Sequence, residues 1–254
     1  LRTQVQTNRL SHAYLFTGTR GTGKTTCAKI LAKAANCLRP VKGEPCNECP
    51  SCVGINNGSI TDVSEIDAAS YTGVDNIRAI RDETAYTPSE AKMRVYIIDE
   101  CHMLSTGANN ALLKTLEEPP PHVIFILATT ELNKVPATIL SRCQLFTFRR
   151  LQPEDIAVRL KEIAAAEKIP LEPDAAELLA RIADGAMRDA ISMLDQCAAS
   201  TTGTIGTEQV LSVIGLSTAS ETLRLARALA AGDSGTALDM LSEMYSGGKD
   251  LVAV

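Results

Sequence analysis

The chain has 254 residues, a formal net charge of −5 and 45% apolar residues, with eight cysteines and no tryptophan. No apolar run approaches the length of about 18 residues that a membrane span needs, and no charged-then-apolar signal segment opens the chain. The negative charge excludes a generally basic nucleic-acid binder, although a local basic lining remains open, and the scarcity of aromatic residues argues against a base-stacking platform. We expect a cytoplasmic protein of more than one part.

The first recognisable feature is a complete phosphate-binding loop. It follows His12–Phe16, which reads as a short buried strand, and it leads into a predicted helix over Thr25–Ala35. The nucleotide-binding residues are expected to be Gly18, Thr19, Gly21, Thr22, Gly23, Lys24, Thr25 and Thr26. The glycines let backbone N–H groups point at phosphate oxygens, while Lys24 supplies a cation and Thr25 a hydroxyl for Mg²⁺. A glycine-rich turn that matches by chance is the alternative, and the agreement of strand, loop and helix disfavours it.

Four cysteines follow this helix in the pattern C-x8-C-x2-C-x2-C. They are Cys37, Cys46, Cys49 and Cys52. The segment around them, about residues 37–57, is rich in Pro, Gly, Asn and Glu and has neither helical nor strand periodicity. Four thiolates that close such a coreless segment predict a structural Zn²⁺ site with no open position for water. Four reduced thiols on a loop are the alternative. The remaining cysteines are expected to be ordinary buried residues: Cys27, Cys101, Cys143 and Cys197.

A second half of the nucleotide site is predicted where the apolar run Val95–Ile98 ends in Asp99 and Glu100. Two carboxylates at the C-terminal end of a buried strand suit Asp99 as the partner of Mg²⁺. They also suit Glu100 as the base that orients the attacking water. A strand end with two acids is often only a solvated turn, but a full phosphate loop in the same chain makes the functional interpretation the better one.

Strands and helices alternate up to residue 150, as a parallel sheet requires. Further strands are predicted at Val63–Asp67, His122–Ala128 and Leu145–Phe148, and helices at Val74–Ala85 and Thr106–Glu117. The predicted fold class is α/β, a doubly wound sheet of five parallel strands. After Arg150 only helices are predicted. We expect three parts: a phosphate-loop domain over 1–150, a helical domain over 151–215, and the start of a further, truncated helical domain over 216–254.

The motifs occur in an order that is specific to one family. Their sequence is the phosphate loop, the four-cysteine insertion, Ile97-Ile98-Asp99-Glu100, Leu127-Ala128-Thr129-Thr130, Ser141-Arg142-Cys143 and Gly185-Ala186-Met187-Arg188-Asp189-Ala190. In this the chain resembles the AAA+ clamp-loader ATPases, and among them most closely the gamma/tau subunits of bacterial DNA polymerase III. The resemblance covers almost the whole chain.

The resemblance assigns roles to individual residues. Thr130 resembles the first sensor, with Thr129 as the fallback. Arg142 resembles the arginine finger that reaches the nucleotide of a neighbouring subunit. Arg188 resembles the second sensor. The resemblance also makes 1–150 an AAA+ ATPase domain, 151–215 the helical lid that carries Arg188, and 216–254 the start of a truncated helical collar. For contacts with primer-template DNA, the plausible contributors are Thr72, at the start of a predicted helix, Arg78 and Lys114.

The implied function is that of a motor subunit that hydrolyses ATP with Mg²⁺, carries Zn²⁺, and loads the sliding clamp onto primed DNA. The implied partners are the delta and delta prime subunits, further gamma/tau copies, the clamp, and the polymerase core through the missing C-terminal region. The subunit would belong to a DNA-directed DNA polymerase holoenzyme without polymerising nucleotides itself. The chain is expected to start after the family's N-terminal segment that contributes to the adenine pocket.

Two alternatives remain. One is a stator subunit of the same complex that binds zinc but does not hydrolyse ATP, which the intact Lys24, Thr25, Asp99 and Glu100 disfavour. The other is a helicase, because Asp99-Glu100-Cys101-His102 has the form of a helicase acidic box. The helical domain with its Gly-Ala-Met-Arg motif disfavours the helicase, and His102 is then expected to be structural.

Overall fold

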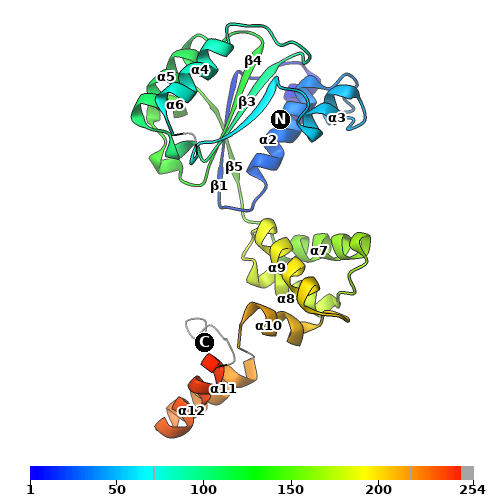
Figure 1. Cartoon of the computed structure of the whole chain (residues 1–254), viewed down its shortest axis with the longest axis vertical. Helices are drawn as coiled ribbons and strands as arrows, with labels where there is room; N and C mark the ends of the chain where they lie inside the picture. Colours follow the sequence, from blue (N-terminus) through cyan, green and yellow to red (C-terminus); the bar gives the residue numbers. More distant parts are fainter. Residues whose placement is uncertain (71, 218, 247–254) are drawn as a thin grey trace. The chain divides into compact units, whose positions relative to one another are not determined.

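The computed structural model describes residues 1–70, 72–217 and 219–246 (Figure 1). The chain divides into two compact units, Leu1–Arg149 and Arg150–Val254. Each unit has a hydrophobic core of its own. Among the residues just given, no helix combines the length and apolar character that crossing a bilayer requires.

The first unit is built on a sheet of five parallel strands in the order β2-β3-β4-β1-β5. The strands are β1 (Ala13–Gly18), β2 (Val63–Asp67), β3 (Arg94–Asp99), β4 (Val123–Thr129) and β5 (Gln144–Phe148). The central strands β1, β3 and β4 are almost continuously apolar because both of their faces are buried. The predicted five-stranded parallel sheet is confirmed.

Helices cover both faces of this sheet (Figure 1). The helices of the unit are α1 (Arg2–Gln6), α2 (Lys24–Asn36), α3 (Pro50–Asn57), α4 (Val74–Glu83), α5 (Thr106–Glu117) and α6 (Ala137–Leu140), with short 3₁₀ turns η1 (Cys101–Met103) and η2 (Leu132–Lys134). Successive strand residues point to opposite faces, so Leu15 and Leu127 pack with α4 and α5, while Phe16 and Ile126 pack with α2. The two layers fix the ends of β1, β3 and β4 beside one another.

The second unit is helical in its described residues. Its helices are α7 (Pro153–Glu167), α8 (Pro173–Ile182), α9 (Met187–Ser200), α10 (Thr207–Ile214), α11 (Ala219–Ala230) and α12 (Ser234–Ser246). Helices α7 to α10 share a core that includes Ile156, Leu160 and Leu179. Leu225 and Met240 belong to a separate small cluster between α11 and α12. The three-part division of the chain, with a boundary after residue 215, stays a prediction.

The cysteine segment contains a helix that its sequence pattern did not predict. Helix α3 occupies Pro50–Asn57, where no periodicity was expected. Pro50 stands at the first position of the helix, where its fixed φ and missing N–H are favourable. Gly58 closes the helix in the left-handed conformation, with φ of 75°. Residues that favour the two ends of a helix thus define α3, and the helix is too short to show an apolar period.

Candidate nucleotide and metal sites

The phosphate loop leaves strand β1 through a glycine that no other residue could replace without movement. Gly18 has φ of 150°, and a Cβ atom built on it would lie 2.3 Å from the carbonyl oxygen of Phe148 on the neighbouring strand β5. Gly23, with φ of 91°, precedes the first turn of α2 in the left-handed region. The loop therefore bends tightly between β1 and α2 and leads to the N-terminus of that helix, as the sequence predicts.

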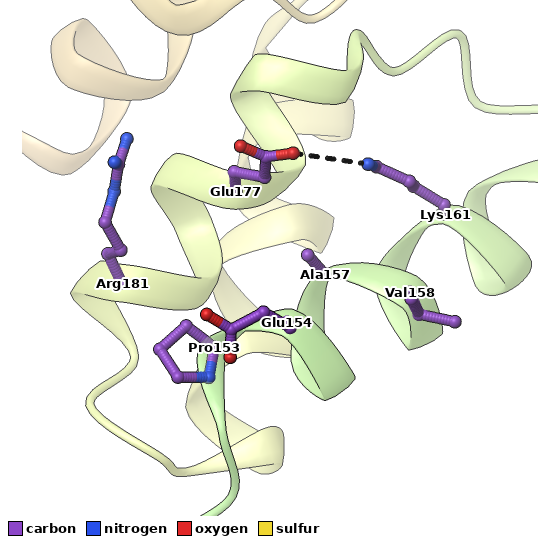
Figure 2. A pocket seen from close by; sticks show the side chains of 7 residues that line it. All are labelled: Pro153, Glu154, Ala157, Val158, Lys161, Glu177 and Arg181. Atoms are coloured by element: carbon purple, nitrogen blue, oxygen red, sulfur yellow. Dashed lines mark ion pairs between the residues drawn. The ribbon is translucent and has the colours of Figure 1, made fainter.

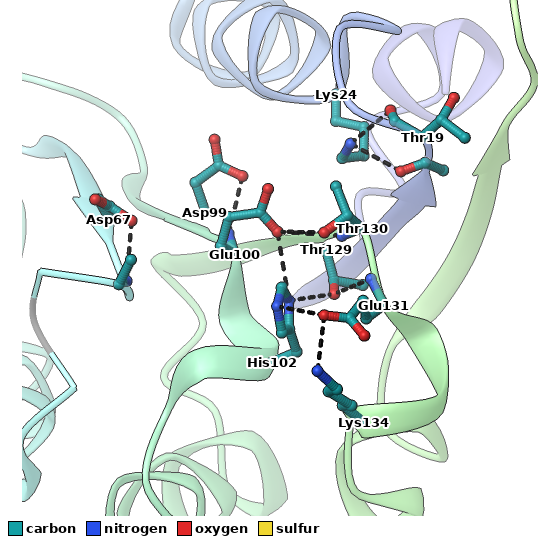
Figure 3. A network of polar contacts seen from close by, with 12 residues as sticks. Thr19, Lys24, Asp67, Asp99, Glu100, His102, Thr129, Thr130, Glu131 and Lys134 are labelled. Carbon is teal, nitrogen blue, oxygen red and sulfur yellow. Dashed lines mark hydrogen bonds and ion pairs between the residues drawn. The ribbon is translucent and has the colours of Figure 1, made fainter. Parts of the chain in front are cut away.

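Lys24 lies inside this loop. The residue is only 6% exposed, and its Nζ donates to the carbonyl oxygens of Gly18 and Thr19 at 2.9 Å each. The Thr22 hydroxyl donates to the same Thr19 carbonyl at 2.8 Å. A buried ammonium needs such acceptors. The loop backbone thus holds a positive charge where the phosphates of a nucleotide would meet it (Figure 3).

Thr25 and Asp99 come together from different elements. The Thr25 hydroxyl, in the first turn of α2, donates to Asp99 Oδ2 at the end of β3 across 2.6 Å. A hydroxyl and a carboxylate oxygen in contact are a donor pair suited to a hard cation such as Mg²⁺. The two predicted metal ligands are therefore adjacent in the structure.

Glu100 follows Asp99 in a left-handed backbone conformation, with φ of 47° and ψ of 44°. A residue other than glycine in this region costs roughly 1–3 kcal/mol. Its N–H donates to Asp99 Oδ1 at 2.9 Å. Its Oε2 accepts from the hydroxyl of Thr130 at 2.9 Å and from the Thr130 N–H at 3.2 Å. The turn therefore brings the carboxylate of Glu100 to the end of β4 (Figure 3).

A buried histidine extends this network. His102 Nδ1 lies 3.0 Å from Thr129 Oγ1 and 3.3 Å from Glu100 Oε2, and Nε2 lies 3.3 Å from Glu131 Oε1. Glu131 also pairs with Lys134 at 2.9 Å, and this contact lowers the pKa of the Glu131 carboxyl. Thr129 contacts His102, whereas Thr130 contacts Glu100. The geometry thus favours Thr130 over the fallback as the polar residue beside the predicted base.

Glu131 was missed in the sequence analysis, because an acid in a polar loop carries no motif. His102 was noted only as a structural residue. The Asp-Glu-x-His spacing contained the available signal, since it places a histidine one short 3₁₀ turn after the acidic pair. What the sequence did not contain is the pairing of that turn with the end of strand β4.

The two arginines of the predicted site have different surroundings. The Arg142 side chain is 33% exposed, and its guanidinium donates to Glu117 Oε1 and to the Thr138 carbonyl at 2.7 Å each. These contacts lie at the end of α5 and in α6. Arg188 is in the first turn of α9, in the second unit. Arg142 thus makes its hydrogen bonds with α5, α6 and the adjacent Ser141, away from the phosphate loop of its own unit.

The residues predicted to approach DNA lie on or beside the neighbouring helices α4 and α5. Arg78 lies on α4 and pairs with Asp75 at 3.1 Å, and Lys114 lies on α5. Thr72 lies just before α4, which begins at Val74 as predicted, with Gly73 as its N-cap. The Thr72 carbonyl accepts from the N–H of Ser105, just before α5.

The four cysteines of the predicted zinc site converge. The sulfur atoms of Cys37, Cys46, Cys49 and Cys52 all lie within 4.8 Å of one another. Cys37 Sγ and Cys49 Sγ are 4.0 Å apart, close to the roughly 3.8 Å expected between sulfurs of a tetrahedral site with Zn–S bonds of about 2.3 Å. The donor set and its spacing fit Zn²⁺.

The surroundings of this cluster favour the thiolate form of two of its cysteines, Cys46 and Cys49. Backbone N–H groups, that of Leu38 first, lower the pKa of Cys49 to about 6, and those of Glu48 and Cys49 lower the pKa of Cys46. Burial raises the pKa of Cys52 to about 12. A bound divalent cation would deprotonate such a buried thiol.

The cysteine cluster is attached to the sheet. Asn36, the last residue of α2, is fully buried, and its Oδ1 accepts from the N–H of Met93 at 2.8 Å. Lys92 Nζ donates to the carbonyl of Cys37 at 3.1 Å. The residues just before β3 therefore fix the first ligand of the cluster.

The other four cysteines were expected to be buried, and two of them are. Cys101 and Cys197 are buried, and burial raises the pKa of both thiols. Cys27 and Cys143 are only partly buried. Each of these two lies at the rim of a core cluster rather than inside it.

A surface hollow of about 330 Å³ lies between α7 and α8 of the second unit (Figure 2). Its lining residues are Pro153, Glu154, Ala157, Val158, Lys161, Glu177 and Arg181. Lys161 Nζ and Glu177 Oε1 face each other at 3.7 Å. None of the predicted site residues lines this hollow.

Comparison with known families finds a match in each unit. Residues 1–152 match the family model of the DNA polymerase III delta subunit, and residues 155–203 match that of the ATPase lid domain of the DNA polymerase III clamp loader subunit. Tau subunits are similar over nearly the whole chain. That of Bacillus subtilis is 51% identical over 98% of this chain, and that of Escherichia coli is 45% identical over 94%. The chain belongs to the gamma/tau family of bacterial DNA polymerase III clamp-loader subunits.

The gamma/tau relatives are longer than this chain. The match spans 44% of the Bacillus subtilis protein and 37% of the Escherichia coli protein. The gamma subunit of Buchnera aphidicola from Acyrthosiphon pisum is 40% identical over 94% of this chain and 66% of its own length. The chain thus spans less than half the length of the Bacillus subtilis and Escherichia coli proteins.

Solved structures confirm the AAA+ fold. The Holliday junction branch migration motor RuvB of Thermotoga maritima aligns over 100% of this chain and 81% of its own, with a TM-score of 0.60 and 18% identity. A single-residue variant of the same motor aligns over 99% of this chain and 80% of its own, with the same TM-score. At this identity the likeness concerns the fold alone, so it does not revive the helicase alternative for this gamma/tau chain.

Proposed function

We propose that the chain is the ATP-hydrolysing motor part of a clamp-loader subunit, which loads the sliding clamp onto primed DNA during replication. The observation that carries the proposal is the contact of Thr25 with Asp99 at 2.6 Å, beside the buried Lys24 and the Glu100–Thr130 pair. These groups belong to the phosphate loop and to the ends of β3 and β4, where a doubly wound sheet binds its ligand.

In the proposed mechanism Lys24 and the backbone N–H groups of the loop bind the phosphates of ATP. Thr25 and Asp99 would hold Mg²⁺, which supplies a charge that stabilises the phosphates during transfer. Glu100 would accept the proton of the attacking water, with Thr130 orienting the Glu100 carboxylate. Each of these residues occupies a place that suits its role.

Two arginines would complete the proposed site, one supplied by a neighbouring subunit and one by the lid. Arg142 would reach the nucleotide of a neighbouring subunit and stabilise charge on the transferring phosphoryl group. Its engagement with Glu117 and Thr138 in its own unit is consistent with a group that acts elsewhere. Arg188 would report the γ-phosphate from the lid, the proposed part over 151–215, and the collar would begin after it.

We further propose that Cys37, Cys46, Cys49 and Cys52 hold a structural Zn²⁺. The sulfur spacing and the lowered pKa of Cys49 support this assignment. Four thiolates leave no position for a water ligand, so the metal would contribute folding free energy rather than chemistry.

The proposed partners are the delta and delta prime subunits, further gamma/tau copies, the sliding clamp, primer-template DNA and the polymerase core, all in the cytoplasm. Thr72, Arg78 and Lys114 would contribute to the DNA contact. All three lie on or beside α4 and α5, which supports a common contact surface without showing one. The subunit would belong to the polymerase holoenzyme but would not polymerise nucleotides.

The match to the delta subunit model favours one second candidate, a stator that binds its partners without hydrolysing ATP. One experiment separates the two. Full-length protein is assembled with its partner subunits, and ATP hydrolysis is measured with and without clamp and primed DNA. A motor subunit is expected to be stimulated by both, and Lys24→Ala in this subunit should remove its share of the turnover. Turnover unchanged by Lys24→Ala would assign the hydrolysis to other subunits and support the stator.

A further inference from the structure

The surroundings of His102 are unusual for a histidine that has only a structural role. Its side chain is 6% exposed, and both ring nitrogens face carboxylate oxygens, Nδ1 that of Glu100 and Nε2 that of Glu131, at 3.3 Å each. A carboxylate only accepts, so a ring nitrogen stabilises it by carrying a proton. The ring is thus aimed at two anionic groups rather than at neutral core atoms.

His122 shows what a structural histidine in this sheet looks like. It precedes β4 at the opposite end of the strand, and its Nε2 lies 3.1 Å from the carbonyl oxygens of Thr84 and Tyr86. Neutral backbone carbonyls, and no carboxylate of a described residue, are the partners of that nitrogen. His102 instead contacts the side chain of the proposed base and a second acid that nothing in the proposed mechanism uses.

We propose that His102 is a positioning residue of the hydrolysis reaction, whose Nδ1 fixes the Glu100 carboxylate through its 3.3 Å contact with Oε2. This inference rests on the proposed role of Glu100 as the base. His102 itself would touch neither ATP nor the attacking water.

The contacts explain how the ring could fix the carboxylate. Glu100 is at the turn after β3, and its side chain has rotatable bonds that would let the carboxylate swing. Thr130 donates to Oε2 from the end of β4, and His102 approaches the same oxygen from η1 (Figure 3). Donors from two elements restrain the side chain more than one, and a general base must be held within hydrogen-bond reach of its proton.

The far side of the ring is fixed as well. Glu131 Oε1 faces Nε2 and is also paired with Lys134 at 2.9 Å. The Thr129 hydroxyl, 3.0 Å from Nδ1, accepts from the N–H of Glu131 at 3.0 Å. The ring therefore links the end of β3 to the loop after β4, and its orientation depends on neither contact alone.

The test compares two substitutions, each of which replaces the ring but keeps a nitrogen at the place of one of its two nitrogens. In His102→Asn the amide nitrogen takes the place of Nδ1, whereas in His102→Gln it takes the place of Nε2. With full-length protein in the assembled complex, kcat and KM for ATP are measured with clamp and primed DNA. We expect His102→Gln and His102→Phe to lose roughly 10- to 100-fold in kcat with nucleotide affinity unchanged. We expect His102→Asn to retain most of the turnover.

A double variant tests whether His102 acts through Glu100. In the Glu100→Gln background, His102→Phe should cause no further loss, because the group that it positions is already gone. His122→Phe is the matched control for loss of a histidine from the same sheet and should leave kcat unchanged. The proposal is overturned if His102→Phe turns over at the wild-type rate, if His102→Gln is active and His102→Asn is not, or if His122→Phe is equally impaired. A wild-type complex without ATP hydrolysis would overturn the proposed function itself, and this inference with it.

Discussion

The hydroxyl of Thr25 donates to the carboxylate of Asp99 across 2.6 Å, although the two residues are 74 positions apart in the chain. The first lies at the start of α2 and the second at the end of β3, so the parallel order of the strands is what brings them together. A pair of oxygen donors already in contact needs little rearrangement to bind a cation. The order of the strands thus places the two proposed Mg²⁺ ligands side by side.

The first prediction tests this pair. Thr25→Val keeps the branched shape but removes the hydroxyl, so the Mg²⁺ concentration needed for half-maximal nucleotide binding should rise by about tenfold or more. Thr25→Ser retains the oxygen and is the matched control. Titration of Mg²⁺ against a fluorescent nucleotide measures both variants. Equal Mg²⁺ requirements in wild type and Thr25→Val would remove Thr25 from the metal site.

A second prediction separates binding from chemistry. Glu100→Gln preserves the size of the side chain but removes the base, so nucleotide should still bind while turnover falls by about 10²-fold or more. Lys24→Ala removes a buried cation from the phosphate loop and should weaken nucleotide binding itself. Equilibrium binding and steady-state hydrolysis of the assembled complex distinguish the two. Normal turnover by the Glu100 variant would assign the base elsewhere.

A third prediction concerns the cysteine cluster. Freshly purified, reduced protein should contain about one zinc per chain, since the free energy of binding a structural zinc is of order 10 kcal/mol. Cys46→Ser should lower the zinc content and loosen residues 37–57 while the phosphate loop remains folded. Elemental analysis and hydrogen exchange measure the two effects. Cys27→Ser, outside the cluster, should change neither, and wild-type protein free of zinc would refute the assignment.

A fourth prediction follows from a buried carboxylate that the sequence did not mark. The Asp62 side chain is 1% exposed, and its oxygens accept from the N–H groups of Ser89, Glu90 and Ala91 and from the guanidinium of Arg94. Burial alone would raise the pKa of Asp62, but these donors together lower it. Asp62→Asn leaves the guanidinium of Arg94, whose side chain is only 16% exposed, without its counterion and should cost about 3 kcal/mol of unfolding free energy at neutral pH.

The pH dependence of that loss has a definite sign. A carboxyl whose folded pKa is lowered contributes stability that is fully present above its unfolded pKa of about 3.9 and is lost as pH falls through the folded value. The difference between wild type and Asp62→Asn should therefore shrink below about pH 4. Urea unfolding at several pH values measures it. Asp75→Asn, an exposed acid on α4, is the control and should cost less than about 0.5 kcal/mol throughout. A difference that grows on acidification would contradict this account.

The sequence predicted the parts of this molecule that rest on periodicity or on a motif. Apolar runs located β3 and β4 to within a residue or two, and Thr106–Glu117 coincides with α5. Helix α3 was missed because a helix of only eight residues that carries Cys52, one of the four clustered cysteines, shows no apolar stripe. The network of Glu100, His102 and Glu131 was missed for a different reason. It depends on which strand ends are neighbours, and strand order is a long-range property that local patterns do not encode.

The last prediction concerns where Arg142 acts. Within its own unit the guanidinium is held by Glu117 and Thr138 at 2.7 Å, so a lone chain places no arginine from this position over its own transferring phosphate. The isolated chain should hydrolyse ATP very slowly, at a rate per chain that hardly rises with concentration. Full-length protein assembled with its partner subunits should turn over faster by about 10³-fold or more, the gain that an arginine supplied by a neighbour can give.

Arg142→Ala should abolish that gain and leave the nucleotide affinity of its own subunit unchanged, because the lost group serves the next site. The control is Arg159→Ala, an exposed arginine of α7 paired with Glu162, which should retain the wild-type turnover. Mixing Arg142→Ala subunits with Lys24→Ala subunits sharpens the test. Where an intact Arg142 faces an intact phosphate loop across an interface, part of the activity should return, since each variant supplies what the other lacks. If Arg142 acts within its own chain, no mixture should recover activity. If Arg142 is needed only for assembly and takes no part in the chemistry, no mixture should recover activity either. Hydrolysis by the isolated chain at the assembled rate would be equally decisive against action on a neighbour, because no second subunit would then be needed.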